Sequence, residues 1–138
     1  MNPLWKVLAL GLALSAAPAL LAHHSFSAEY DSTKPVALKG VVTKVEWANP
    51  HIWFYIAVKD QAGQVVQWQC EGGAPNSLVR QGWSRTSLKE GDEVDIQGFL
   101  AKDGTHTANA RSVTLPGGKR VFAGSADDGG PSSAGKKQ

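Results

Sequence analysis

Four histidines are the residues of this sequence best suited to bind a metal. His23 and His24 are adjacent near the N-terminus, whereas His51 and His106 each follow a turn sequence. An imidazole nitrogen is a common transition-metal ligand, and an N-terminal histidine adds its own α-amino group. Nitrogen ligands in planar arrangements favour Cu(II). We therefore take His23, His24, His51 and His106 as candidate ligands, with Cu as the candidate cofactor.

The histidines also have a purely structural interpretation. The chelate at His23 requires that the mature chain begins there, and without that cleavage the pair is a solvated leader. His51 can instead cap a strand through a backbone hydrogen bond. Both interpretations depend on how the first 22 residues are processed.

Residues 1–22 have the pattern of a secretory signal peptide. Lys6 precedes an uncharged run, rich in Leu and Ala, that is interrupted by Gly11 and Pro18. This run is shorter than the about 20 apolar residues of a membrane span, so we expect no stable span after cleavage. Two cleavage points compete: Ala17-Pro18-Ala19 fits the small-x-small rule, whereas for cleavage after Ala22 only Ala22 is small and Leu20 is not. An uncleaved anchor is the alternative.

Export narrows the functional classes. We expect the protein to be periplasmic or secreted. Nucleotide cofactors are scarce outside the cytoplasm, so an enzyme that depends on them is disfavoured. Without Lys6 the chain has 13 basic and 12 acidic residues, so its net charge of +1 attracts no nucleic acid. Cys70, the one cysteine, has no internal disulfide partner and is best explained as a small buried hydrophobe.

The rest of the chain alternates with a period of two residues, as expected of β-strands. Ile52, Phe54 and Ile56 mark one face of the clearest strand. A short helix is expected from Pro75, with Gly82 as its terminator. The expected strands cover residues 36–47, 51–58, 65–70, 94–100, 105–115 and 120–123.

This order, with a first strand broken at Gly40 and a helix between strands three and four, predicts an all-β protein built as a small OB-like β-barrel. A small open sandwich is the alternative, but it leaves the helix unexplained. The expected domains are the signal peptide at 1–22, an N-terminal segment at 23–34, the barrel at 35–123 and a disordered tail at 124–138.

The second candidate site is the outer face of strands two and three. With Ile52, Phe54 and Ile56 inside, Trp53 and Tyr55 point outward beside Gln67 and Gln69. Aromatic and amide side chains together can bind a saccharide or a periplasmic partner protein. Alternatively, residues 26–31 cover these aromatics.

Several motifs together resemble a family of small exported bacterial proteins classed as a domain of unknown function. The resemblance spans residues 22–124 and implies export and a small β-barrel rather than an assigned reaction. The motifs are Ala22-His-His-Ser-Phe26, Glu29-Tyr-Asp31, Gly40-x-Val-Thr-Lys-Val-Glu-Trp47, Asn49-Pro-His51, Gly82-Trp83 and Ser87-Leu-Lys-x-Gly-Asp92.

Signatures of catalysis are few. The sequence contains no nucleophile elbow and no His-x-x-x-His or Cys-x-x-Cys spacing. Asp60 and Asp103 are each followed closely by glycine, as hairpin-forming residues are. We therefore expect a binding module that is not an enzyme, with a metal ion, a saccharide or a periplasmic protein as its partner.

The processing of the N-terminus can be tested directly. We expect the exported protein to lose its first 19 or 22 residues, and the intact mass of the secreted or periplasmic form distinguishes the two. A mass that matches a chain beginning at His23 would mean that the amino-terminal chelate can form. A mass that matches a chain beginning at Leu20 would exclude the chelate. The mass of the full-length chain would contradict the signal-peptide prediction.

Overall fold

The computed structural model describes residues 26–124, which form six strands and two short helices. The predicted signal peptide, His23, His24 and the tail from residue 125 lie outside the described residues. The elements are α1 (Phe26–Glu29), β1 (Tyr30–Glu46), β2 (Trp53–Lys59), β3 (Val65–Glu71), α2 (Pro75–Arg80), β4 (Glu93–Ala101), β5 (Thr107–Thr114) and β6 (Arg120–Phe122).

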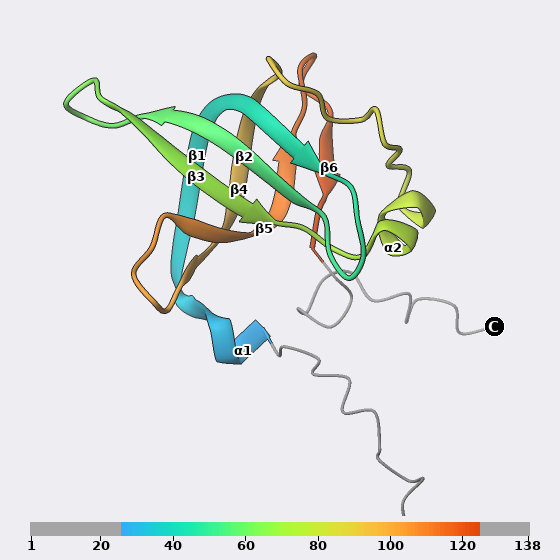
Figure 1. Ribbon diagram of the computed structural model, residues 1–138, viewed down its shortest axis with the longest axis horizontal. Helices are drawn as coiled ribbons and strands as arrows, with labels where there is room; N and C mark the ends of the chain where they lie inside the picture. Colours follow the sequence, from blue (N-terminus) through green and yellow to red (C-terminus); the bar gives the residue numbers. More distant parts are fainter. Residues whose placement is uncertain (1–25, 125–138) are drawn as a thin grey trace, which may run out of the picture.

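The strands form one mostly antiparallel sheet in the order β3-β2-β1-β4-β5-β6 (Figure 1). A parallel pairing of β3 with β5 adds a second connection between the two halves of this order. The predicted all-β class is confirmed, and the short helix between the third and fourth strands is present as α2. Neither helix within residues 26–124 has the length and apolar character needed to cross a bilayer.

Strand β1 is long because it pairs with two strands in turn. Residues up to Val41 pair with β4, and residues from Gly40 onward pair with β2. A Cβ at Gly40 would lie 2.5 Å from the carbonyl oxygen of Ala57, so only glycine permits this close approach. The strand begins at Tyr30 rather than at the predicted residue 36. Its register shifts between Val42 and Lys44 against β2 and between Asp31 and Pro35 against β4, rather than at Gly40.

The alternation predicted for the second strand is confirmed. Ile52, Phe54 and Ile56 are fully buried. The strand itself begins at Trp53, two residues later than predicted, because Ile52 bonds through both its backbone groups to the loop glycines Gly72 and Gly73 instead of to β1. His51 therefore precedes β2, at the end of the sheet where β3 finishes.

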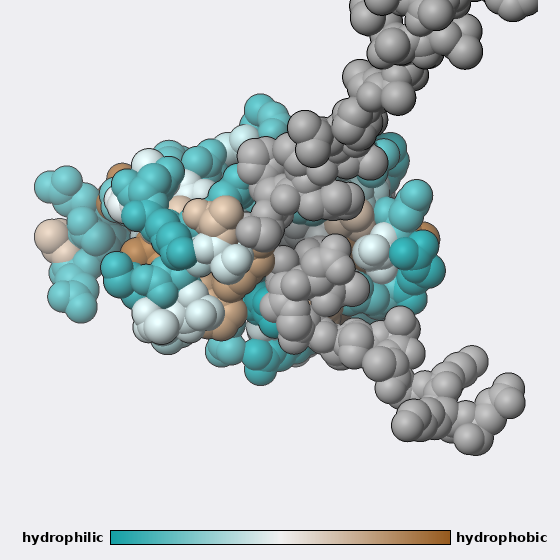
Figure 2. Space-filling view, turned by 90° about the horizontal axis from the view of Figure 1, so that it is seen from below, coloured by the Kyte–Doolittle hydropathy of each residue, from teal (hydrophilic) through white to brown (hydrophobic). Residues whose placement is uncertain are grey.

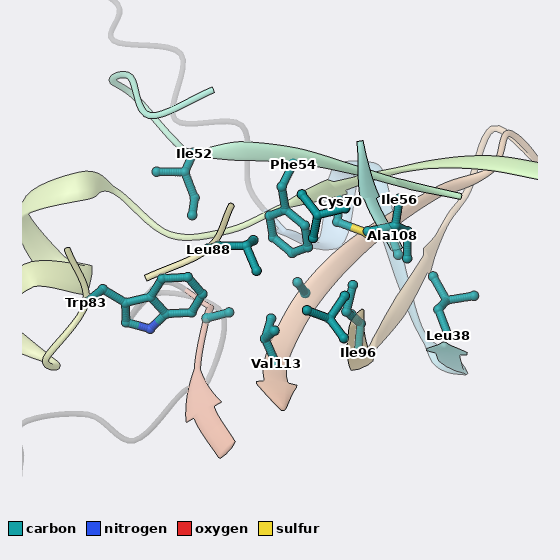
Figure 3. Packing of buried hydrophobic residues seen from close by; sticks show 14 of the residues in the cluster. Leu38, Ile52, Phe54, Ile56, Cys70, Trp83, Leu88, Ile96, Ala108 and Val113 are labelled. Atoms are coloured by element: carbon teal, nitrogen blue, oxygen red, sulfur yellow. The ribbon is translucent and has the colours of Figure 1, made fainter. Parts of the chain in front are cut away.

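The buried side chains of both halves meet in one core (Figure 3). Phe54 and Cys70 from the β2–β3 hairpin face Ile96 and Val113 from β4 and β5. Beyond the strands, α2 contributes Leu78, and the segment after it contributes Trp83 and Leu88. Gly82 ends this helix with a φ of 93°, as the sequence predicted.

The last strands differ from the prediction only at their ends. Asp103 accepts hydrogen bonds from the backbone and hydroxyl of Thr105, so residues 105 and 106 belong to the turn and β5 begins at Thr107. The Trp83 indole donates a 2.8 Å hydrogen bond to the Phe122 carbonyl, which ties the segment after α2 to β6.

The buried position of Cys70 makes its thiol unreactive. Burial raises the pKa of the thiol to about 12, so the reactive thiolate is scarce at neutral pH. We expect a disulfide-exchange reagent to label Cys70 slowly at pH 8 in the native protein and quickly in denaturant, as followed by absorbance. Fast labelling of the folded protein would contradict the buried assignment.

Candidate functional site

A buried carboxylate lies at the centre of the site. The Glu71 side chain is only 8% exposed, although it carries a charge that needs donors. The Tyr30 hydroxyl donates a hydrogen bond to Oε2 of Glu71, and Nδ1 of His51 is paired with Oε1. Both oxygens of the carboxylate are thus held by donors from separate parts of the chain.

Three elements bring these residues together. Glu71 is the last residue of β3, His51 lies two residues before β2, and Tyr30 is the first residue of β1. Tyr30 pairs with Ala101 at the end of β4, so its ring crosses toward β3. Tyr30, His51 and Glu71 are separated by 20 to 41 positions in the sequence. They meet here because β1 spans the sheet and pairs with both β4 and β2.

The neighbouring strand β5 encloses the carboxylate further. In the parallel pairing, Glu71 lies opposite Asn109, and Gln69 lies opposite Thr107. Asn109 and Thr107 are both buried, and Gln69 donates a 2.7 Å hydrogen bond to the Thr107 hydroxyl. This edge of the site is therefore polar but shielded from water.

Aromatic packing fixes the chain that leads to Tyr30. The Phe26 ring stacks on Tyr30 with centroids 5.7 Å apart and meets Phe99 of β4 edge-on at 5.6 Å. The Arg111 guanidinium lies 6.0 Å from the Phe26 centroid and 5.7 Å from that of Phe99. Helix α1 is therefore anchored to the sheet beside the buried carboxylate.

The candidate histidines that the structure describes do not lie together. His51 contacts Glu71, whereas the His106 ring packs against Trp68 with centroids 5.0 Å apart. Trp68 and Glu71 are three residues apart in β3, so their side chains leave opposite faces of the strand. Within residues 26–124, no three His, Cys, Asp or Glu side chains are grouped closely enough to hold a metal.

The predicted outer face of β2 and β3 is hollowed in two places. The first depression, which we call the Trp53 hollow, has a volume of about 580 Å³. The second, the Trp68 hollow, has a volume of about 300 Å³. Trp53, Tyr30, Gln69, Lys102, Asp103 and Thr107 line the first, and Tyr55, Gln67, Trp68, Gln69, His106 and Thr107 line the second.

Residues 26–31 cover only part of this face. Ala28, Glu29 and Tyr30 form a wall of the Trp53 hollow but do not line the Trp68 hollow. The hydrogen bond from Nζ of Lys102 to the Ser27 carbonyl, 2.6 Å long, holds this wall in place. Figure 2 views the molecule from the side of α1 and shows hydrophilic residues bordering apolar ones.

Tyr55 lies in a polar cluster with two residues of β1. Its hydroxyl donates a 3.1 Å hydrogen bond to Glu46, and Lys44 pairs with the same carboxylate while its Nζ lies 5.3 Å from the Tyr55 centroid. Burial, followed by the bond to Glu46, raises the pKa of Tyr55. The bond from Lys44, followed by that from Tyr55, lowers the pKa of Glu46.

Sequence reasoning did not single out Glu71 or Trp68. Glu71 shares the alternation of Gln67 and Gln69, and an acidic residue directly after Cys70 in a strand was an available signal. The alternation in β3 predicts that Trp68 shares the inner side of the strand with Cys70. The structure leaves it half-buried, so its edge lines the Trp68 hollow.

The residues of the site fall within the part of the chain that matches a protein family. The model of a family described as one of unknown function, DUF6152, matches residues 11–110. The chain belongs to this family. The DUF6152 match includes Tyr30, His51, Glu71 and both hollows. No curated protein and no solved structure matches the chain.

Removal of the Tyr30 hydroxyl should destabilise the fold. Tyr30→Phe leaves one oxygen of a buried carboxylate without this donor, which we expect to cost about 1.5–3 kcal/mol. Urea unfolding measures the loss. Tyr55→Phe is the matched control, because Glu46 is solvated, and should cost less than about 1 kcal/mol. Equal losses would contradict the special role of Glu71.

Proposed function

We propose that this protein is an exported, non-enzymatic binding module whose outer β2–β3 face binds a saccharide chain. The observation that carries the proposal is the pair of adjoining hollows. Trp53, Tyr55, Gln67 and Gln69 all line one hollow or the other, and Gln69 and Thr107 line both. A ligand of two or more linked rings can therefore contact both hollows at once.

The chemistry of the lining suits sugar rings. A pyranose has apolar C–H faces that pack on an indole, and its hydroxyl groups bond to amides and hydroxyls. Each hollow supplies one tryptophan, and Gln67, Gln69, Thr105 and Thr107 supply donors and acceptors. This mixture of aromatic and uncharged polar groups resembles that of ligand pockets in general.

The charges at the Trp53 hollow favour a neutral ligand over a polyanion. Lys102 and Asp103 lie side by side in its lining, together with Glu29. A phosphate backbone would meet carboxylates here rather than the cluster of Lys and Arg that nucleic-acid binding requires. The small net charge of the mature chain supports the same choice.

We further propose that the sheet is an OB-type barrel. The pairings β1–β2, β2–β3, β3–β5, β5–β4 and β4–β1 lead back to the first strand, and α2 lies between β3 and β4. In that fold, the face of strands two and three is the usual site for oligosaccharides. The N-terminal signal pattern supports a periplasmic or secreted location, where cell-wall glycans are available.

Glycan binding can be measured by calorimetry with the mature protein. The probes are soluble peptidoglycan glycan strands and chitotetraose as a neutral oligosaccharide. Trp53→Ala should weaken binding by about tenfold or more because it removes the stacking surface, and Gln69→Ala should weaken it because it faces both hollows. Lys59→Ala, at the distal end of the same hairpin, is the control and should bind normally.

Two outcomes would overturn the saccharide assignment. The first is that neither probe binds the wild-type protein. The second is that a probe binds but Trp53→Ala and Lys59→Ala bind equally well, which would move the site to another face. Circular dichroism of each variant checks that the fold is intact.

A further inference from the structure

We propose that a hollow over β1, β4, β5 and β6 binds an organic carboxylate with an apolar body, and that Arg120 is its anchor. This depression, which we call the Arg120 hollow, has a volume of about 500 Å³. None of the described residues that line it also lines the Trp53 hollow or the Trp68 hollow. The site is therefore separate from the glycan face proposed above.

The charge of the lining favours an anion. Arg111 and Arg120 both line the Arg120 hollow, whereas none of the described residues in its lining is acidic. Nε of Arg120 donates a 3.1 Å hydrogen bond to the Ser112 hydroxyl, and its Nη2 donates a 2.7 Å hydrogen bond to the side-chain oxygen of Gln97. Both partners are neutral, so no carboxylate within residues 26–124 balances the charge of this guanidinium.

The two hydrogen bonds fix the guanidinium of Arg120 and leave part of it for a ligand. They use Nε and one N–H of Nη2, so Nη1 and the second N–H of Nη2 remain. These two nitrogens form the end of the fork that can bond to both oxygens of a carboxylate. Ser112 is buried in β5 and pairs with Gln97 of β4, so the sheet itself supports the fork. Binding therefore costs less side-chain entropy than it would at an unsupported arginine.

The rest of the lining is mostly apolar and suits a carbon skeleton. Strand β1 contributes Pro35, Val36 and Ala37, and β4 contributes the ring of Phe99. A hydrocarbon body would remove this apolar surface from water, which an inorganic ion would not do. The guanidinium of Arg111 lies 5.7 Å from the Phe99 centroid, so a cation and an apolar wall adjoin here. The lining therefore fits a carboxylate joined to an apolar body better than inorganic phosphate.

Two register shifts meet at the Arg120 hollow. In the β4–β5 pair, the partners of Gln97 and Gly98 skip Arg111, which is therefore the extra residue of a β-bulge. In the β1–β4 pair, the register shifts just before Pro35. A bulge bends its strand and changes the direction of a side chain, and bulges are frequent beside functional sites. Pro35, Gly98 and Arg111 all line the hollow, so both irregularities border the proposed site.

The test is a titration of the mature protein with benzoate, which joins a carboxylate to one apolar ring, followed by ¹H–¹⁵N NMR. Benzoate should shift the Nε–H signal of Arg120 and reach saturation. Arg120→Gln should weaken binding by about tenfold or more, because it removes both the charge and the fork. Lys119→Gln is the matched control. It removes the same charge one residue earlier, outside the lining, and should bind normally at about 0.15 M salt.

Gln97→Glu separates ligand binding from stability. The substitution places a carboxylate on the guanidinium of Arg120 and keeps that side chain attached to β4, so the variant should melt no earlier than the wild type. It should nevertheless weaken benzoate binding by about tenfold or more, because the charge is then balanced within the protein. Normal benzoate binding by Gln97→Glu would contradict the role of Arg120.

Three further probes test the two parts of the ligand. Benzamide keeps the ring without the charge, acetate keeps the charge without the ring, and inorganic phosphate is an anion without an apolar body. Each should bind about tenfold more weakly than benzoate, or worse. Phosphate that binds as tightly as benzoate would overturn the organic ligand.

Two results would overturn the site itself. The first is that benzoate shifts no signal of the lining, and the second is that Arg120→Gln and Lys119→Gln bind benzoate equally well. In either case Arg120 would only hold β6 to the sheet. Glycan binding should be unchanged in Arg120→Gln, so the two proposals are decided separately.

Discussion

The architecture depends on one strand that supplies hydrogen-bond partners to two neighbours in succession. Strand β1 pairs with β4 until Val41 and with β2 from Gly40, and the missing side chain of Gly40 permits the close approach at the changeover. Because of this sharing, the β2–β3 hairpin and the β4–β5 pair enclose a common core. The same strand carries Tyr30 at its start, which brings the N-terminal segment to the end of β3.

The buried carboxylate of Glu71 is the local consequence of that arrangement. A charge with so little solvent exposure is tolerated only when donors satisfy it, and a tyrosine and a histidine from distant segments do so. These contacts join the start of β1, the segment before β2 and the end of β3.

The proposed glycan face and the Glu71 network lie on neighbouring parts of the molecule and differ in their side chains. Aromatic and amide groups dominate the hollows over β2 and β3, whereas nitrogen and carboxylate groups dominate the end where β3 meets His51. Tyr30 belongs to both regions, since it lines the Trp53 hollow and bonds to Glu71. A ligand in that hollow would therefore contact a residue that also bonds to Glu71, whereas His51 lines neither hollow.

The sequence alone determined the strand faces, the helix between the third and fourth strands, the buried state of Cys70 and the shared outer face of Trp53, Tyr55, Gln67 and Gln69. These follow from local periodicity and turn chemistry, which act over a few residues. Only the tertiary structure decided that Tyr30, His51 and Glu71 meet and that His106 lies elsewhere. Contacts between residues 20 to 41 positions apart depend on strand register and on where β1 changes partner, and no local pattern encodes either.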